Sequence, residues 1–472
     1  MTTIGMSVGT GEHIGSAVAR LLARTPDAAG RLVSAGVEAP AIDPIALFAA
    51  AGEADLEAAL WLRPSEGLAL VGVGRAWAAE GAGPARFRDA EAGWRDLVDG
   101  AALEGEATPT LLGGLGFTGR RPAEEDPWAP FGPSSMVLPK LLLATRDGAS
   151  TLTASAVGAP DPRAVDARWE SLADRARALT PPSAGMVARP VFAPLHTDRS
   201  QPDRPTWTRT VETMAGAVGR GRLDKVVLAR RVDLRSPVEL DVPNALRRLA
   251  ASAPESTIYA FRRAGRTFLG ATPERLVRVD GRRFRTVAIA GTIGRGADEA
   301  EDAALAAELL ASEKDREEHA IVVHYIRELL APVAAEVTVA PQPAVMTLRF
   351  VQHLATEIEG TLPDDAGLLA LGERLHPTPA VGGDPREAAL AMIDEHEGFD
   401  RGWYAGPVGW MDAAGKGELC VALRCGIVDR ARASLFAGCG IVADSDPARE
   451  WEESRIKLRA IVSALGMLED ES

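Results

Sequence analysis

The strongest constraint on the fold is a series of short apolar segments, rich in β-branched residues, that follow one another with very short connections. Strands are predicted at 225–234, 257–262, 266–270, 274–280, 283–288, 336–340, 345–350, 418–428 and 433–439. Helices are predicted near 207–221, 243–252 and 298–330, the last broken near Ser312. Because connections this short join antiparallel neighbours, the chain is predicted to be α+β with antiparallel sheets, not a doubly wound parallel sheet.

The composition restricts the class of ligand. The 472 residues give room for roughly two to four domains, and 46% hydrophobic with 25% charged residues is typical of a globular protein. The formal net charge of −14 disfavours a nucleic-acid partner, since binding DNA or RNA requires neutralising phosphates. A small-molecule substrate is therefore favoured.

The cysteines and the hydropathy pattern indicate the cellular compartment. Cys420, Cys425 and Cys439 are too few and too unevenly spaced for a disulfide framework or a four-thiolate zinc site. The N-terminus has no basic flank before an apolar run, and no segment reaches about 18 uncharged apolar residues. We expect a cytoplasmic protein with reduced cysteines and no membrane partner.

The chain divides in composition near residue 200. Residues 1–200 are rich in Ala, Gly and Pro, with strand-like runs at 68–74 and 136–146. The polar, Pro-containing segment 196–207 is predicted to be an exposed connector. The chemistry-bearing patterns lie in the second region, 205–468.

Two predicted helices carry pairs of carboxylates three residues apart. Asp315 and Glu318 form one pair, and Glu450 and Glu453 form the other. Residues at i and i+3 share a helix face, so two such faces could together hold a hard cation such as Mg²⁺. The spacing alone equally fits an ordinary surface pair between Glu453 and Lys457, with the remaining acids stabilising helix N-termini.

Several polar residues occur in mainly apolar surroundings. Lys225 begins an apolar strand, where burial would lower its pKa and make it a base, although a solvated lysine at a strand edge also fits. Glu274 follows a Pro-fixed turn that can aim a side chain into a pocket, and such glutamates are often merely solvated. Arg424 lies in a very apolar segment and requires an anionic partner. His353 and Tyr404 are further polar residues of this kind.

A different function class rests on one motif. GTGEHIG (9–15) has the glycine spacing of a dinucleotide-binding loop, which would predict NAD binding and a dehydrogenase. No clear strand precedes it and no βαβ unit follows, so a plain turn is favoured. Phosphate-loop, nucleophile-elbow and HExxH patterns are absent from the sequence.

Taken together, residues 205–468 resemble the chorismate-utilising enzyme family. The resemblance rests on motifs in the family's order: DKVVLARR, TPERLVRV, AGT, SEKDREEH, HLATEIEG, LHPTPAVGG, FDRGWYAGPVGW, VALRCGI and FAGCGIVADSDPAREWEESRIKL. It implies two large, mainly antiparallel β-sheets packed as a sandwich core with helices outside. Residues 1–200, which match only loosely, would contribute to that β core.

The resemblance also implies roles for individual residues. Lys225 would be the general base that activates water, and Glu274 the general acid. Magnesium would be bound by Glu318 and Glu453, with Asp315 and Glu450 acting through water. The expected substrate-binding residues are Gly291, Thr292, His353, Thr378, Tyr404, Arg424, Gly438, Gly440 and Lys457.

The activity implied is the Mg²⁺-dependent isomerisation of chorismate to isochorismate, in which water adds at C2 and the C4 hydroxyl leaves. Ala290 stands where aminodeoxychorismate synthases have a nucleophilic lysine, and Lys225 argues against an anthranilate synthase with its glutaminase subunit. A salicylate synthase, which also eliminates pyruvate, is the main alternative, and a catalytically silent chorismate-binding protein is another. We expect a monomer, and the sequence leaves open whether the product enters menaquinone or siderophore biosynthesis.

Overall fold

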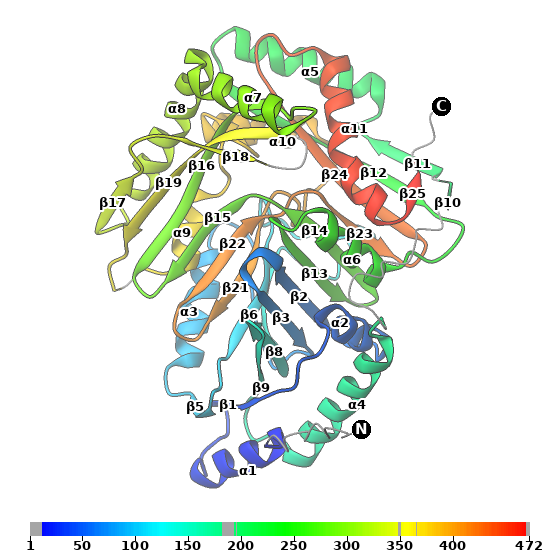
Figure 1. The fold of residues 1–472 in the computed structure, drawn as a ribbon, viewed down its shortest axis with the longest axis vertical. Helices are drawn as coiled ribbons and strands as arrows, with labels where there is room; N and C mark the ends of the chain where they lie inside the picture. The colour runs from blue at the N-terminus through cyan, green and yellow to red at the C-terminus, as the bar shows by residue number, and fades with distance from the viewer. Residues whose placement is uncertain (1–11, 182–192, 195, 348–350, 365, 469–472) are drawn as a thin grey trace, which may run out of the picture.

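The computed structural model describes residues 12–181, 193–194, 196–347, 351–364 and 366–468, without the side chains of 193–194, 196–198, 314, 318 and 467–468. Two sheets run through the molecule, and helices cover their outer faces (Figure 1). The α+β class with two large, mainly antiparallel sheets is therefore confirmed.

Within the described part of the chain, thirteen strands form the larger sheet. Their order is β11 (His196–Gln201), β12 (Lys225–Arg235), β24 (Arg432–Ile441), β23 (Cys425–Asp429), β14 (Arg266–Thr272), β13 (Thr257–Arg263), β2 (Ala58–Arg63), β3 (Leu68–Val73), β8 (Leu141–Arg146), β9 (Ala149–Val157), β1 (Leu32–Glu38) and β5 (Ala102–Gly105), with β20 (Gly383–Asp384) beside β12. All neighbours pair antiparallel except β1 and β5.

The smaller sheet has ten described strands, all antiparallel. Their order is β17 (Glu336–Val339), β19 (Val351–Thr361), β16 (Arg283–Gly294), β15 (Arg275–Asp280), β22 (Gly417–Val421), β21 (Pro407–Asp412), β6 (Thr110–Leu115), β7 (Ser134–Leu138) and β4 (Trp77–Glu80), with β18 (Ala344–Thr347) beside β19. A short parallel pair joins β10 (Ala193–Pro194) to β25 (Met467–Leu468). Both large sheets contain strands from both ends of the sequence.

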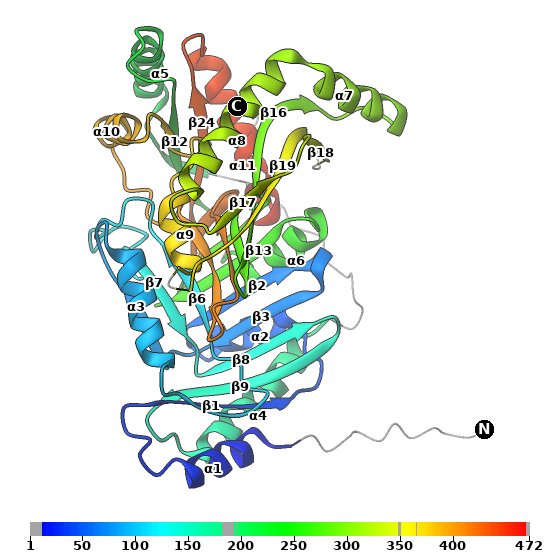
Figure 2. The ribbon, with the colours of Figure 1, turned by 90° about the vertical axis from the view of Figure 1, so that its left-hand side faces the viewer.

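One group of helices packs on the larger sheet and another group packs on the smaller sheet (Figure 2). The larger sheet packs against α1 (Ile14–Arg24), α2 (Pro44–Glu53), α5 (Arg204–Gly219), α6 (Val242–Ser252), α10 (Arg386–His396) and α11 (Pro447–Ala464), while α4 (Pro162–Leu179) packs on α1 and α2. The smaller sheet packs against α3 (Arg86–Val98), α7 (Glu299–Ala311), α8 (Glu313–Leu330) and α9 (Leu368–Leu375), and a 3-10 turn, η1 (Pro64–Glu66), precedes β3. Among the described helices, none has both the length and the apolar character needed to cross a membrane.

Two of the places where the chain passes between the two sheets are adjacent. It leaves the larger sheet after β14 and enters the smaller one at β15, and it returns between β22 and β23. The Val421 amide donates to the Glu274 carbonyl at 3.0 Å, and the Ala271 amide donates to the Arg424 carbonyl at 3.3 Å. Glu274 and Arg424 are therefore held in neighbouring crossings.

Three predictions of local structure are wrong. The single strand predicted at 418–428 is two strands, β22 and β23, because Arg424 has a φ of +49° and turns the chain into the other sheet. The run at 136–146 likewise divides into β7 and β8. The predicted connector at 196–207 contains edge strand β11 and the start of α5, since an edge strand can be polar on its open side.

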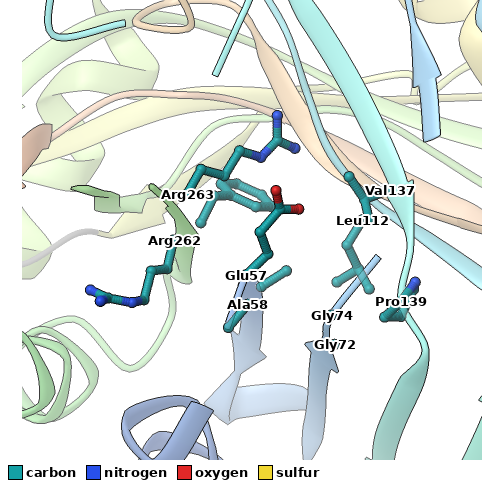
Figure 3. Close-up of a pocket in the computed structure, with 11 residues that line it drawn as sticks. Glu57, Ala58, Gly72, Gly74, Leu112, Val137, Pro139, Arg262 and Arg263 are labelled. Atoms are coloured by element: carbon teal, nitrogen blue, oxygen red, sulfur yellow. The ribbon is translucent and has the colours of Figure 1, made fainter. Parts of the chain in front are cut away.

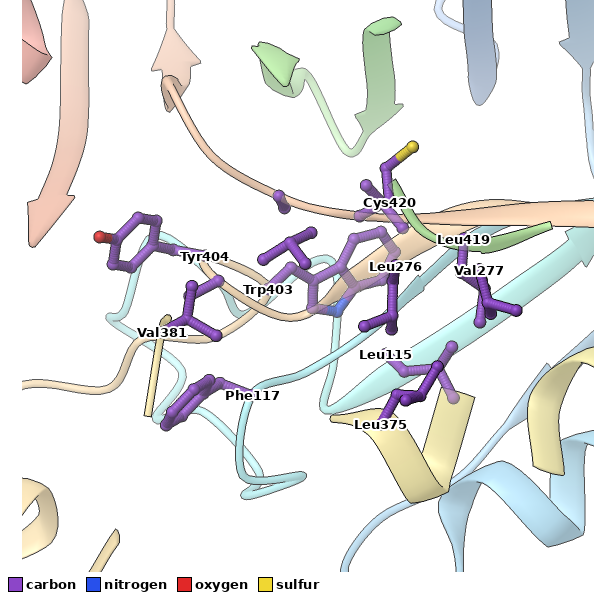
Figure 4. Close-up of a cluster of buried hydrophobic side chains, with 14 of the residues drawn as sticks. Leu115, Phe117, Leu276, Val277, Leu375, Val381, Trp403, Tyr404, Leu419 and Cys420 are labelled. Carbon is purple, nitrogen blue, oxygen red and sulfur yellow. The ribbon is translucent and has the colours of Figure 1, made fainter. Parts of the chain in front are cut away.

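The core lies between the sheets and under the helices. Apolar side chains of the smaller sheet and of neighbouring loops gather around Trp403, Leu276 and Leu419 (Figure 4). Trp403 also packs on Phe261 and Phe268 of the larger sheet. A cavity of ≈ 20 Å³ lies between β2, β3 and β13, lined by Glu57, Leu112 and Arg263 among others (Figure 3). That volume accommodates about one water molecule, so this cavity is excluded as a substrate site.

Candidate active site

The candidate site lies where strands of both sheets have an open edge. Strand β24 pairs with β23 only from Arg432 to Phe436, so Gly438 and Gly440 pair with β12 alone. Strand β16 pairs with β15 only up to Arg285, so its later residues pair with β19 alone. Unpaired backbone groups at a sheet edge need other partners, and the two sheet crossings bring charged side chains to the same region.

Two glycines of β24 make room for functional side chains. A Cβ added at Gly440 would lie 2.5 Å from Cε and 3.1 Å from Nζ of Lys225, so the lysine side chain lies across this glycine. A Cβ at Gly438 would lie 2.9 Å from the Tyr404 hydroxyl oxygen. Any larger residue at either position would displace Lys225 or Tyr404. The structure therefore brings four of the predicted residues together.

Glu274 is a residue of the site whose carboxyl group has a strongly shifted pKa. Burial raises its pKa to about 7, and the positive charges of Lys225, Arg424 and Lys457 oppose that rise. The opposing charges show that all three cations lie close enough to act on Glu274. A glutamic acid that keeps its proton up to near-neutral pH can serve as a general acid.

Arg424 is a partly buried cation that forms no ion pair with the described residues. Burial lowers its pKa, and the charges of Tyr404, Glu453 and Glu274 act in the opposite direction. A desolvated guanidinium gains much from a carboxylate that it can bind through two parallel hydrogen bonds. Arg424 is thus suited to an anionic substrate group.

The smaller sheet contributes a second wall. Thr292 on β16 lies opposite His353 on β19, and its hydroxyl is 2.9 Å from His353 Nδ1. Burial lowers the pKa of His353, and the charge of Arg424 lowers it further. The register shifts at Gly291, whose φ of +73° favours glycine, and a Cβ there would lie 3.1 Å from Cβ of Asp315.

Helix α11 provides the described acidic cluster. The Asp446 side chain caps its N-terminus, accepting from the Arg449 amide at 2.9 Å. Ligand atoms of Glu450, Glu453 and Cys439 all lie within 4.8 Å of one another. Burial raises the pKa of Glu450, and the negative charge of Glu453 raises it further. Two mutually repelling carboxylates fit a hard divalent cation, whereas the Cys439 thiol is not a magnesium ligand.

The other predicted metal residues are on α8. Ser312 caps this helix by accepting from the Asp315 amide at 3.3 Å, and Asp315 lies against Gly291. Asp315 is not part of the cluster on α11, and the Glu318 side chain lies outside the described residues. The four-residue magnesium set therefore stays a prediction.

Lys457 links the acidic cluster to the open strand edge. Its Nζ donates to the Gly438 carbonyl at 2.8 Å and lies 2.6 Å from Glu453 Oε1. The surface pair between Glu453 and Lys457 that the spacing allowed is present, and both residues also border the site. The two interpretations of this helix face are thus compatible.

Comparison with known proteins agrees with this geometry. A sequence profile described as Chorismate binding enzyme matches residues 18–466. The chain belongs to the chorismate-binding enzyme family. The salicylate biosynthesis isochorismate synthase of Pseudomonas aeruginosa is 38% identical over 442 residues, covering 93% of this chain and 92% of that protein. Isochorismate synthase MenF of Bacillus subtilis is 35% identical over 420 residues, covering 86% and 87%.

A solved structure extends the similarity to the fold. The menaquinone-specific isochorismate synthase MenF of Escherichia coli superposes with a TM-score of 0.77 at 26% identity, covering 95% of this chain and 99% of that chain. Because 95% of this chain is covered, the similarity includes most of residues 1–200 as well as residues 205–468. The predicted membership of the chorismate-binding family is confirmed.

Sequence reasoning missed a buried ion pair that supports the site. Glu397 and Arg401 are each 2% exposed and pair with one another. Glu397 accepts from the Ala229 amide at 2.7 Å, while Arg401 donates to the carbonyls of Val227 and Val381, both at 2.8 Å. The pair occupies the edge of β12 between β20 and β11, where no strand is present among the described residues. The sequence feature that could have indicated this pair is the charged segment FDR (399–401), which lies in a mainly apolar region.

The same ion pair reaches two predicted substrate-binding residues. The Arg401 carbonyl accepts from the Tyr404 amide at 2.9 Å, and the Tyr404 ring stacks on Phe436. Val381 closes a turn by donating to the Thr378 carbonyl at 3.1 Å. The Thr378 hydroxyl is buried and has no hydrogen-bond partner among the described residues. Buried hydroxyls are usually hydrogen-bonded, so this one is an exception that the described protein atoms do not satisfy.

The Arg401→Ala substitution should lower the free energy of unfolding by about 3–5 kcal/mol, because it leaves the Glu397 carboxylate buried and unpaired. Chemical denaturation measures this loss. The exposed helical pair of Arg177 and Asp174 provides the control, since Arg177→Ala should cost less than about 1 kcal/mol. Equal stability of the two variants would contradict the role assigned to the buried pair.

Proposed function

We propose that this protein is an isomerase that converts chorismate to isochorismate. The proposal is carried by one observation: a partly buried arginine without a carboxylate partner among the described residues, Arg424, beside Glu274, whose pKa is about 7. The names of the Pseudomonas aeruginosa and Bacillus subtilis relatives support it. Chorismate carries two carboxylates and a hydroxyl that must be protonated to leave, which matches these two groups.

The reaction needs a base and an acid at different positions of one ring. In its neutral form, Lys225 would remove a proton from the water that attacks C2. Glu274 would give its proton to the C4 hydroxyl as this group leaves, and the ring double bonds shift between the two carbons. Because burial raises the pKa of Glu274 to about 7, a large share of this carboxyl keeps its proton near neutral pH and can act as the acid.

The remaining residues would bind and orient the substrate. Arg424 and Tyr404 would hold the enolpyruvyl carboxylate. Lys457 and the open edge of β24 would contact the ring of the substrate. On the opposite wall lie Thr292 and His353. Gly291, Thr378, Gly438 and Gly440 would complete the set.

Glu318 and Glu453 would hold a magnesium ion, with Asp315 and Glu450 acting through water. When bound, such an ion stabilises negative charge on the substrate carboxylate and fixes its orientation. The protein's own contribution would be to bring carboxylates from α8 and α11 to one point beside the substrate.

The two parts of the chain would have different roles. Residues 205–468 would carry the chemistry, while residues 1–200 supply strands to both sheets and thereby stabilise the crossings that hold Glu274 and Arg424. The enzyme would act as a monomer. It would need no glutaminase subunit, because water and not ammonia is the nucleophile.

Activity should fall as the pH rises above about 7. Because burial raises the pKa of Glu274 to about 7, the carboxyl is protonated below that pH and ionised above it, and only the protonated form can donate. The pH profile of kcat/KM measures this alkaline limb. Glu274→Gln should lower activity by about 100-fold or more, and an unchanged alkaline limb in its residual activity would contradict the assignment.

Lys225→Gln should reduce isochorismate formation by about 100-fold or more, because glutamine cannot accept a proton from water. Circular dichroism should show an unchanged fold. The exposed residue Lys140 gives the control, since Lys140→Gln makes the same substitution in the connection between β7 and β8 and should keep full activity. Near-normal product formation in Lys225→Gln would rule out its role as the base.

Glu453→Ala should weaken Mg²⁺ binding by about tenfold or more, because a hard cation is held mainly by its anionic oxygen ligands. Titration calorimetry with Mg²⁺ alone measures this without relying on turnover. Glu452→Ala is the matched control, as Glu452 neighbours Glu453 on α11 and pairs with Arg455 instead. Asp315→Asn should have a smaller effect than Glu453→Ala. Wild-type affinity in Glu453→Ala would refute the metal role.

Catalysis should stop at isochorismate. Eliminating pyruvate requires the enolpyruvyl group to fold over the ring, whereas Arg424 and Tyr404 would hold it extended. Incubation with purified isochorismate, assayed with lactate dehydrogenase, should show conversion back to chorismate without pyruvate. Rapid pyruvate release with salicylate fluorescence would instead identify the protein as a salicylate synthase.

A further inference from the structure

A second, larger cavity lies on the same two strands as the candidate active site but at their other end. Its volume is ≈ 450 Å³, within the range of small-molecule sites. Four arginines and three carboxylates line it, from five strands and the loop before β7: Arg199, Arg231, Arg266, Arg432, Glu125, Asp233 and Asp429. Four arginines and three carboxylates give the lining a formal charge of +1, whereas the chain as a whole carries −14, so the cavity is less acidic than the rest of the protein.

This cavity is separate from the candidate active site. Asp233 is eight residues along β12 from Lys225, which corresponds to about 27 Å in an extended strand. Aromatic rings fill the space between them: Phe436 packs on Trp128 at a centroid distance of 5.3 Å and on Phe399 at 6.4 Å. A ligand in the cavity would therefore not contact the residues proposed for catalysis.

Two of the four arginines are fixed and neutralised. Arg231 binds the Asp233 carboxylate through Nε and Nη2, each at 2.9 Å, and the Ser434 hydroxyl donates to the same carboxylate at 2.6 Å. Arg266 lies 3.3 Å from Asp429 and donates to the Asp126 carbonyl at 2.9 Å. These contacts give the cavity a rigid polar wall.

The other two arginines have no such partners. Arg199 on β11 and Arg432 on β24 are exposed and form no ion pair with any residue that the structure describes. Arg199 lies opposite Asp233, which lies opposite Ser434, and Arg432 is two residues from Ser434 on the same face. Two strand spacings and two residues separate the two arginines, a span of about 12 Å. Their long side chains reach the cavity from opposite sides.

We propose that this cavity binds a small organic anion through Arg199 and Arg432. The ligand class is one with carboxylate or phosphate groups, because both have the geometry that an arginine fork binds with two hydrogen bonds. The paired arginines of the wall add hydrogen-bond donors and shape. This binding does not depend on the proposed isomerase activity.

Titration calorimetry of the full-length protein with inorganic phosphate and with succinate tests the proposal. Comparing the two probes shows whether the cavity prefers a phosphate or a carboxylate group. At least one of these probes should bind with a dissociation constant near or below about 1 mM. Arg432→Ala should weaken that binding by about tenfold, and Arg199→Ala with Arg432→Ala should abolish it. Both residues are exposed, so the variants should keep the thermal stability of the parent protein.

Two further variants locate the binding. Arg283→Ala removes an exposed arginine of the smaller sheet and should leave the affinity unchanged. Arg424→Gln should also leave it unchanged, since Arg424 belongs to the candidate active site. Failure of both probes to bind would overturn the proposal. So would equal affinity in the double variant, or loss of binding in Arg424→Gln, which would place the anion in the active site.

Discussion

The candidate site depends on two adjacent backbone crossings between the sheets, β14 to β15 and β22 to β23. Each crossing donates one amide to a carbonyl of the other, so Glu274 and Arg424 are held side by side although 150 residues separate them in the sequence. Neither residue could be placed this way within a regular strand, because strand side chains alternate between two faces. The position of an acid next to a cation thus follows from how the sheets are connected.

Burial at these crossings determines the chemistry. Desolvation favours the neutral form of Glu274 and disfavours the charged form of Arg424, so both pKa values move toward neutrality. The three nearby cations prevent a larger rise for Glu274. An anionic substrate would compensate the buried positive charge, which gives the site a reason to bind a dicarboxylate in an otherwise acidic protein.

The surroundings of the site fix its geometry through backbone contacts. The buried pair of Glu397 and Arg401 replaces missing strand partners along β12, next to the strand end that carries Lys225. Glycines 438 and 440 remove the side chains that would occupy the space of Tyr404 and Lys225. These features explain how Gly440 and a buried ion pair, both distant from Lys225 in the sequence, shape the surroundings of this lysine.

The sequence by itself determined the class of fold and the family, because hydrophobic alternation, short connections and the motif order are local properties of the chain. It also gave the helix boundary at Ser312, whose side chain caps α8. Only the tertiary structure decided that the apolar run 418–428 divides between two sheets, since both halves are buried and the left-handed turn at Arg424 has no glycine to mark it. It also decided which polar residues meet: burial, open strand edges and the raised pKa of Glu274 arise from packing between distant segments, which no local pattern encodes.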